Sequence, residues 1–108
     1  MTYSRDEQIE IANTIISQLG GNKFRAMTGA KNFFALDSGL SFTLPGGGGF
    51  CKQGINHVKI LLNSMDLYDV EFSKVRRGIF QKISEHNGIY DDMLQDIFRA
   101  ETGLNTSL

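Results

Sequence analysis

A cluster of basic residues carries the clearest chemical signal in the sequence. Its four members, which fall within nine positions, are Lys74, Arg76, Arg77 and Lys82. Planar guanidinium groups bind phosphate or carboxylate through paired hydrogen bonds, and a neighbouring ring such as Phe80 could stack a nucleobase. A second neighbouring ring, Phe72, alternates with polar residues in a way that places it in the predicted core. The cluster therefore predicts either a nucleic-acid site or a solvated charged turn.

Residues able to perform nucleophilic or metal chemistry are few and scattered. The single Cys51 has no histidine at a spacing known for thiol enzymes, and His57 and His86 belong to no metal-binding pattern. One cysteine and two histidines would need a carboxylate and a favourable fold to complete a zinc site. The sequence therefore predicts no catalytic residue, no metal site and no cofactor, and it favours a protein that is not an enzyme.

Two further patterns have structural interpretations. Asp69 and Glu71 lie two positions apart on one face of a predicted strand. With Asp66 they are interpreted as solvated surface charge rather than as a glycosidase pair. The run Gly46 to Gly49 follows Pro45 but lacks the Lys-Ser or Lys-Thr of a phosphate-binding loop, so a hairpin tip is predicted. Hairpin tips frequently contact partners.

Length and composition limit the class of protein. A chain of 108 residues, 41% of them hydrophobic, is expected to form one domain over residues 1–108 with a single core. The formal net charge of -1 lacks the basic excess of most nucleic-acid binders, although a local patch is compatible with it. One cysteine and no signal-like or membrane-spanning segment predict a cytoplasmic protein.

The periodicity of the apolar residues defines the elements that must position these groups. Ser4 and Glu7 form a capping-box pattern, and the apolar stripe after them predicts a helix that ends at Gly20 and Gly21. Candidate strands cover residues 23–28, 33–36, 40–44, 58–62, 68–73 and 79–84. A sheet of about five strands is expected, and the membership of 23–28 is left open.

A second helix closes the predicted domain and stops at Gly103. Its apolar face is formed by Tyr90, Met93, Leu94, Ile97 and Phe98. Short connections between the strands indicate an antiparallel meander. The predicted fold class is therefore α+β, an antiparallel meander of about five strands with an N-terminal and a C-terminal helix packed on one face.

Three stretches of the chain resemble a recurrent pattern in small bacteriophage and prophage proteins of unknown function. They are GGNKFRAMTGAKNF at 20–33, the segment from INHVKI to MDLYDVEF at 55–72, and the ending at 98–108 that contains TGL and TSL. The resemblance covers most of the chain in order. It implies an origin in a phage or mobile element and a place inside a bacterial host cell, but no activity, cofactor or catalytic residue.

Three functional hypotheses follow. The first is a non-enzymatic, phage-like accessory protein that binds a host or phage protein, such as a defence component, through exposed aromatic anchors. The candidate anchors are Tyr3, Phe50, Tyr68 and Tyr90. The alternative is nucleic-acid binding through the basic cluster of residues 74–82. An enzyme is the third hypothesis, for which the sequence supplies no recognisable set of reacting groups.

The edges of the predicted sheet suggest self-association. The segment 33–36 contains two phenylalanines and is apolar enough to pair with the same strand of a second copy. A homodimer through a sheet edge is therefore one expected arrangement.

Overall fold

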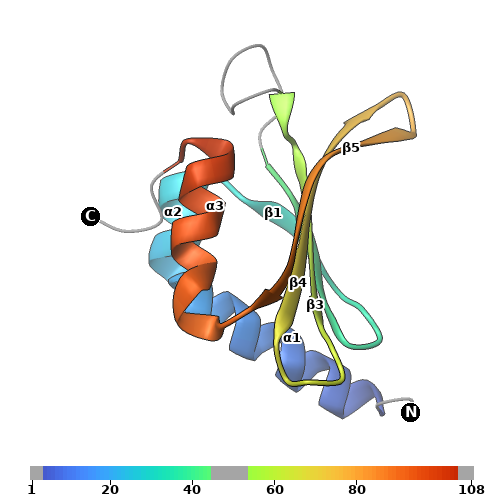
Figure 1. Ribbon diagram of the computed structural model, residues 1–108, viewed down its shortest axis with the longest axis vertical. Coiled ribbons are helices and arrows are strands. Elements are labelled where there is room, and N and C mark those ends of the chain that lie inside the picture. Colours follow the sequence, from blue (N-terminus) through green and yellow to red (C-terminus); the bar gives the residue numbers. More distant parts are fainter. Residues whose placement is uncertain (1–3, 45–53, 105–108) are drawn as a thin grey trace.

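The chain folds as a five-stranded antiparallel sheet with the described helices on one face (Figure 1). The computed structural model describes residues 4–44 and 54–104. The helices are α1 (Arg5–Leu19), α2 (Asn22–Thr28), the 3-10 turn η2 (Asp91–Met93) and α3 (Leu94–Thr102). The strands are β1 (Lys31–Ala35), β2 (Gly39–Thr43), β3 (His57–Leu62), β4 (Tyr68–Arg76) and β5 (Ile79–Ile89). Each strand pairs with its neighbours in sequence, so the predicted α+β meander is confirmed.

Helix α1 begins and ends where the sequence predicts. The Ser4 hydroxyl accepts the Glu7 amide at 3.3 Å, and the Glu7 carboxylate accepts the Ser4 amide at 3.0 Å. The bond from the Ser4 amide lowers the pKa of the Glu7 carboxyl, because it stabilises the charged form. At the other end, the amide of Gly20 caps the carbonyls of Ile16 and Ser17.

Residues 23–28, a candidate strand by sequence, form helix α2 instead. The buried side chains decide the outcome, since Phe24 and Thr28 lie four positions apart and both have 0% exposure. That spacing is the period of a helix, whereas the alternation of Lys23, Phe24 and Arg25 resembles a strand over too few residues. Gly29, with a φ of 71°, ends the helix in the left-handed conformation.

Helices α2 and α3 end in the same pattern, Phe-Arg-Ala-x-Thr-Gly, at residues 24–29 and 98–103. In each, the threonine hydroxyl donates to the phenylalanine carbonyl four residues earlier, at 2.7 Å in α2 and 2.8 Å in α3. The same hydroxyl accepts the amide two residues further on, at 3.2 Å in both helices. One buried side chain thus satisfies backbone groups on both sides of the helix end.

Phenylalanine rings join the helices to the sheet. The Phe24 ring of α2 lies 5.4 Å from Phe42 of β2 and 5.0 Å from Phe98 of α3. Phe98 in turn lies 6.5 Å from Phe72 of β4. The four rings are between 0% and 2% exposed and form the centre of the core, so the prediction that Phe72 faces inward is confirmed.

The start of the C-terminal helix differs from the prediction. Tyr90 and Met93, expected on its apolar face, are 60% and 44% exposed. Residues 91–93 form the 3-10 turn η2, and the α-helix begins only at Leu94. Because the tighter turn changes the helical phase, the side chains that α3 buries are Leu94, Phe98 and Thr102.

Gly39 permits the closest approach between two strands. It pairs with Leu61 of β3, and a Cβ atom at position 39 would overlap the carbonyl oxygen of Ile60 and stand 2.9 Å from the Leu61 Cα. Gly39 is not among the glycines with positive φ, so space rather than backbone conformation requires glycine here.

Replacing Gly39 with alanine is expected to lower the free energy of unfolding by about 2–4 kcal/mol, because the added methyl forces β2 away from β3. Gly78→Ala is the matched control. Its site is open space but its φ is 77°, so only a backbone cost of about 1–2 kcal/mol applies. Urea denaturation measures both variants. A smaller loss for Gly39→Ala than for the control would contradict the prediction.

Candidate functional site

The β4–β5 hairpin extends past the rest of the sheet as a two-stranded arm. Strand β3 begins at His57, which pairs with Ser73, whereas β4 and β5 stay paired as far as Arg76 and Ile79. Residues 74–81, called the arm below, therefore have no third strand beside them among the described residues. Figure 1 shows this hairpin projecting away from the helices.

A two-residue turn closes the arm. Arg77 and Gly78 both have positive φ, 53° and 77°, which corresponds to a type I′ turn. Glycine adopts this conformation freely, whereas an arginine in it carries some strain. The turn places the charged Arg77 side chain at the end of the arm, where it is exposed.

Asn56 anchors the base of the arm. Its side-chain amide donates to the carbonyl of Val75 at 2.9 Å and accepts the Val75 amide at 2.7 Å. Its own backbone amide donates to the carbonyl of Ser73 at 3.0 Å. The side chain thus supplies the two hydrogen bonds that a strand residue would have supplied, and β4 is held in line beyond the start of β3.

The structure divides the predicted basic cluster between two faces of the hairpin. One groove, of about 400 Å³, is lined by Lys74, Arg76, Arg77, Ile79 and Gln81. Lys82 pairs with Ser73, so by strand alternation it points to the face opposite Lys74. Its ammonium lies there 3.6 Å from Glu85. The four cations therefore do not form one continuous patch, because the hairpin register separates Lys82 from the other three.

A second groove lies where the arm meets the sheet face opposite the helices. Its volume is about 540 Å³, and its lining residues are Lys31, Asn32, Phe34, Thr43, Leu44, Asn56, His57, Val75 and Phe80. The rings of Phe34 and Phe80 are 64% and 63% exposed. Among the described residues that line it there is no acid, and Lys31 is the one lysine or arginine. We call it the aromatic groove.

His57 contributes a third ring to the aromatic groove. It makes an edge contact with Phe80 at a centroid distance of 5.1 Å. Burial lowers the pKa of His57, and Lys59 lowers it further, whereas Glu71 opposes the shift. The imidazole is therefore neutral near pH 7, and it offers the groove a flat ring with polar nitrogens.

Of the aromatic anchors predicted for protein binding, Tyr68 and Tyr90 lie within the described residues. Tyr68 is 6% exposed and belongs to the core, so its prediction as an exposed anchor is wrong. It pairs with Leu62 on the helix-covered face, and burial raises the pKa of its phenol. Tyr90 is exposed and lies at the residue directly before η2. Outside the described residues lie Tyr3, Phe50, Cys51 and the run Gly46 to Gly49.

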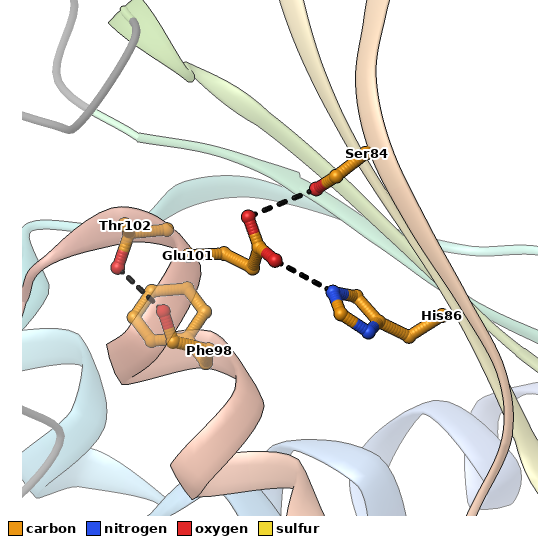
Figure 2. A network of polar contacts seen from close by, with 5 residues as sticks. All are labelled: Ser84, His86, Phe98, Glu101 and Thr102. Atoms are coloured by element: carbon orange, nitrogen blue, oxygen red, sulfur yellow. Dashed lines mark hydrogen bonds and ion pairs between the residues drawn. The ribbon is translucent and has the colours of Figure 1, made fainter.

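A polar cluster fixes α3 to β5 (Figure 2). One oxygen of Glu101 accepts the Ser84 hydroxyl at 3.0 Å, and the other accepts His86 Nε2 at 2.7 Å. These residue types also occur in nucleophilic triads. Here, however, the serine hydroxyl contacts the carboxylate rather than the imidazole, so the described residues lack the serine–histidine hydrogen bond on which such a triad depends. The arrangement is a clamp between the helix and the last strand.

Asp69, predicted to lie on a solvated strand face, connects the turn after β3 to strand β5. Its Oδ1 accepts the Asn63 side-chain amide at 3.2 Å and the Gly88 backbone amide at 3.0 Å. This acid therefore has a structural role. Within residues 4–44 and 54–104, no group of three or more His, Cys, Asp or Glu side chains is arranged to hold a metal ion.

Asn56 and His57 were not predicted as functional, and Phe34 was predicted only as part of a sheet edge that could pair with a second copy. Their positions depend on strand register, which pairs Phe34 with Ser41 and turns its ring to the face opposite the helices. One sequence signal was available for Phe34. It follows Phe33 directly, so in a strand one of these two rings must point away from the core.

The chain has no match among known proteins that would indicate its function. No protein-family model matches it, and neither a curated protein nor a solved structure does. Its similarity to small phage and prophage proteins therefore stays a prediction. Of the helices in the described part of the chain, none is long and apolar enough to cross a membrane. Function has to be argued from the site itself.

The lowered pKa of His57 predicts a loss of stability in acid. The unfolded chain binds a proton at the ordinary pKa of 6.5, whereas the folded chain binds it only at lower pH. The free energy of unfolding therefore falls as the pH drops below about 6.5, since the unfolded state then holds more protons. His57→Gln is expected to make this fall shallower. Urea denaturation between about pH 7 and pH 5 tests it, and parallel curves would contradict it.

The Glu101 clamp predicts a graded loss of stability. Glu101→Ala, which removes both hydrogen bonds, is expected to lower the free energy of unfolding by about 2 kcal/mol, and Ser84→Ala by about 1 kcal/mol. Asp96→Asn is the control, because its exposed ion pair with Arg99 contributes about 0.5 kcal/mol or less. Equal losses in the three variants, measured by denaturation, would show that Glu101 does not clamp α3.

Proposed function

We propose that this chain is a small, non-enzymatic accessory protein that binds nucleic acid with the arm. The observation that carries the proposal is the charge of the arm. Lys74, Arg76 and Arg77 line one groove, and within the described residues none of the three takes part in an ion pair. Cations without a partner in their own chain are free to neutralise phosphates.

The charge of the chain is unevenly distributed. The nine residues 74–82 hold four of the eleven Lys and Arg residues and none of the twelve Asp and Glu residues. Seven cations and twelve acids are left for the rest of the chain. The net charge of -1 therefore combines a basic hairpin with an acidic body. This polarity supports the proposal, because an acidic body would orient the arm toward a polyanion.

The shape of the arm fits the same ligand. The arm is a narrow ribbon of two paired strands, with no third strand beside it among the described residues, so a phosphate backbone can approach it closely. Arg76 and Arg77 are both exposed near the end of the arm, where they can reach phosphate oxygens on a strand outside the body.

The phage-like resemblance supports the cellular setting of the proposal. A small protein of that origin would act in the cytoplasm of a bacterial host, where both host and phage nucleic acids are accessible.

Binding of a host or phage protein is the second candidate. It is favoured by three large apolar side chains that stay exposed on the arm and beside it, namely Ile79 at 71%, Phe34 at 64% and Phe80 at 63%. Exposed aromatic and aliphatic groups near arginines are typical of protein interfaces.

Nucleic-acid binding by the arm predicts a steep dependence on salt. The double variant Arg76→Gln/Arg77→Asn removes two cations, and asparagine tolerates the positive φ of position 77. We expect its affinity for a labelled oligonucleotide to fall about tenfold at low salt. The slope of log affinity against log salt should fall by about 2. Fluorescence anisotropy at several salt concentrations measures both quantities.

The control for this experiment removes two cations from the helices. Lys23→Gln/Arg99→Gln has the same change of charge, and both side chains are exposed outside the arm. If the two double variants lose affinity equally, the arm is not the site. If the protein binds no oligonucleotide and instead co-purifies with a protein after nuclease treatment, the second candidate replaces the first.

A further inference from the structure

We infer that the aromatic groove receives an unpaired nucleobase, so that the nucleic acid bound by this protein is single-stranded. This inference rests on the proposed function and specifies its ligand. It is carried by a feature that the arm cations do not explain. The exposed rings of Phe34 and Phe80 line the aromatic groove, together with the neutral imidazole of His57. None of the described lining residues is an acid.

Two large apolar rings that stay exposed at one groove require an explanation. Phe34 and Phe80 come from β1 and β5, the two edge strands of the sheet, and they meet at one groove. An exposed phenylalanine loses the free energy that burial would provide, about 2–3 kcal/mol for a full side chain. Flat rings on the open face of a sheet are the surfaces on which single-stranded binders stack bases.

The polar groups of the aromatic groove suit a nucleotide. Lys31 contributes an ammonium that takes part in no ion pair within the described residues, and the lining holds no carboxylate that would repel phosphate. His57 adds ring nitrogens that can bond to the edge of a base. The volume of about 540 Å³ lies in the range of small-ligand sites and can hold a base with its sugar.

The position of Phe80 links the groove to the arm cations. Phe80 pairs with Val75, and the next pair toward the turn is Arg76–Ile79. By strand alternation the Phe80 ring points to the groove side, while Arg76 points to the other side of the same two-stranded arm. A strand that crosses the edge of the arm can therefore set its phosphates against the arginines and one base in the groove.

A base-paired duplex fits this arrangement poorly. The faces of paired bases are covered by their neighbours in the stack, so a duplex can present phosphates to the arm but no ring face to Phe34 or Phe80. Contact with the groove therefore distinguishes a single strand from a duplex. Contact with the arm alone does not, because both ligands carry phosphate.

The test compares a labelled single-stranded DNA of about 12 nucleotides with a duplex of the same sequence, by fluorescence anisotropy. The length lies within the range of site sizes known for single-strand binders. We expect the wild-type protein to bind the single strand about tenfold more tightly than the duplex. Phe34→Leu/Phe80→Leu keeps the apolar character but removes the rings, and we expect it to lose about tenfold or more for the single strand only.

Met65→Ala is the matched control for lost apolar surface. Met65 is 76% exposed in the turn between β3 and β4, outside the described lining of both grooves, so its truncation should leave the preference for single strands unchanged. Phe80→Trp supplies a second readout, because the chain contains no tryptophan. A base stacked on that indole should quench its fluorescence in the single-strand complex but not in the duplex complex.

The outcomes separate this inference from the proposed function. If the arm variants weaken binding while the duplex binds as well as the single strand, or while the leucine variant binds like wild type, the inference fails and the proposed function stands. If neither oligonucleotide binds, both fail. If light scattering finds a dimer that Phe34→Lys converts to a monomer, the groove is covered by a second copy and the inference is overturned.

Discussion

The packing of four phenylalanine rings on one side of the sheet is the constraint on which the rest of the structure depends. Phe24 and Phe98 belong to two short helices, and each ring finds its apolar neighbours only on the face that presents Phe42 and Phe72. Helices as short as α2 and α3 are not stable alone, so this contact fixes both. Because all the described helices pack on one face of the sheet, no described helix covers the side chains of the opposite face (Figure 1).

The division of the sheet into a helix-covered face and an opposite face explains why the two candidate grooves lie at the arm. The ladder between β3 and β4 ends at the His57–Ser73 pair, whereas β4 and β5 continue beyond it. A two-stranded ribbon is marginal in water without support from a third strand or a helix. Asn56 supplies part of that support through its two bonds to Val75. The same amide side chain also lines the aromatic groove.

The sequence predicts those features that depend on local signals. The Ser4–Glu7 capping box, the alternating strands and the stop at Gly103 follow from neighbouring residues, and the structure has them. The grooves depend on register instead. Irregularities between Lys31 and Phe34 and between Phe72 and Ser73 decide which side chains share a face, and periodicity does not reveal them. One error was avoidable: the Phe-Arg-Ala-x-Thr-Gly pattern of 24–29 recurs at 98–103, within a segment of plain helical periodicity.

The turn at Arg77 and Gly78 has a consequence for the thermodynamics of association. A hairpin closed by two residues and pinned at Val75 has few backbone conformations to lose when a ligand binds. The same cations on a long irregular loop would have to be ordered at the moment of binding, at about 1–2 kcal/mol for each residue fixed. Much of that ordering takes place here during folding, so the arm is pre-organised, and contacts made by its tip appear more fully in the measured affinity.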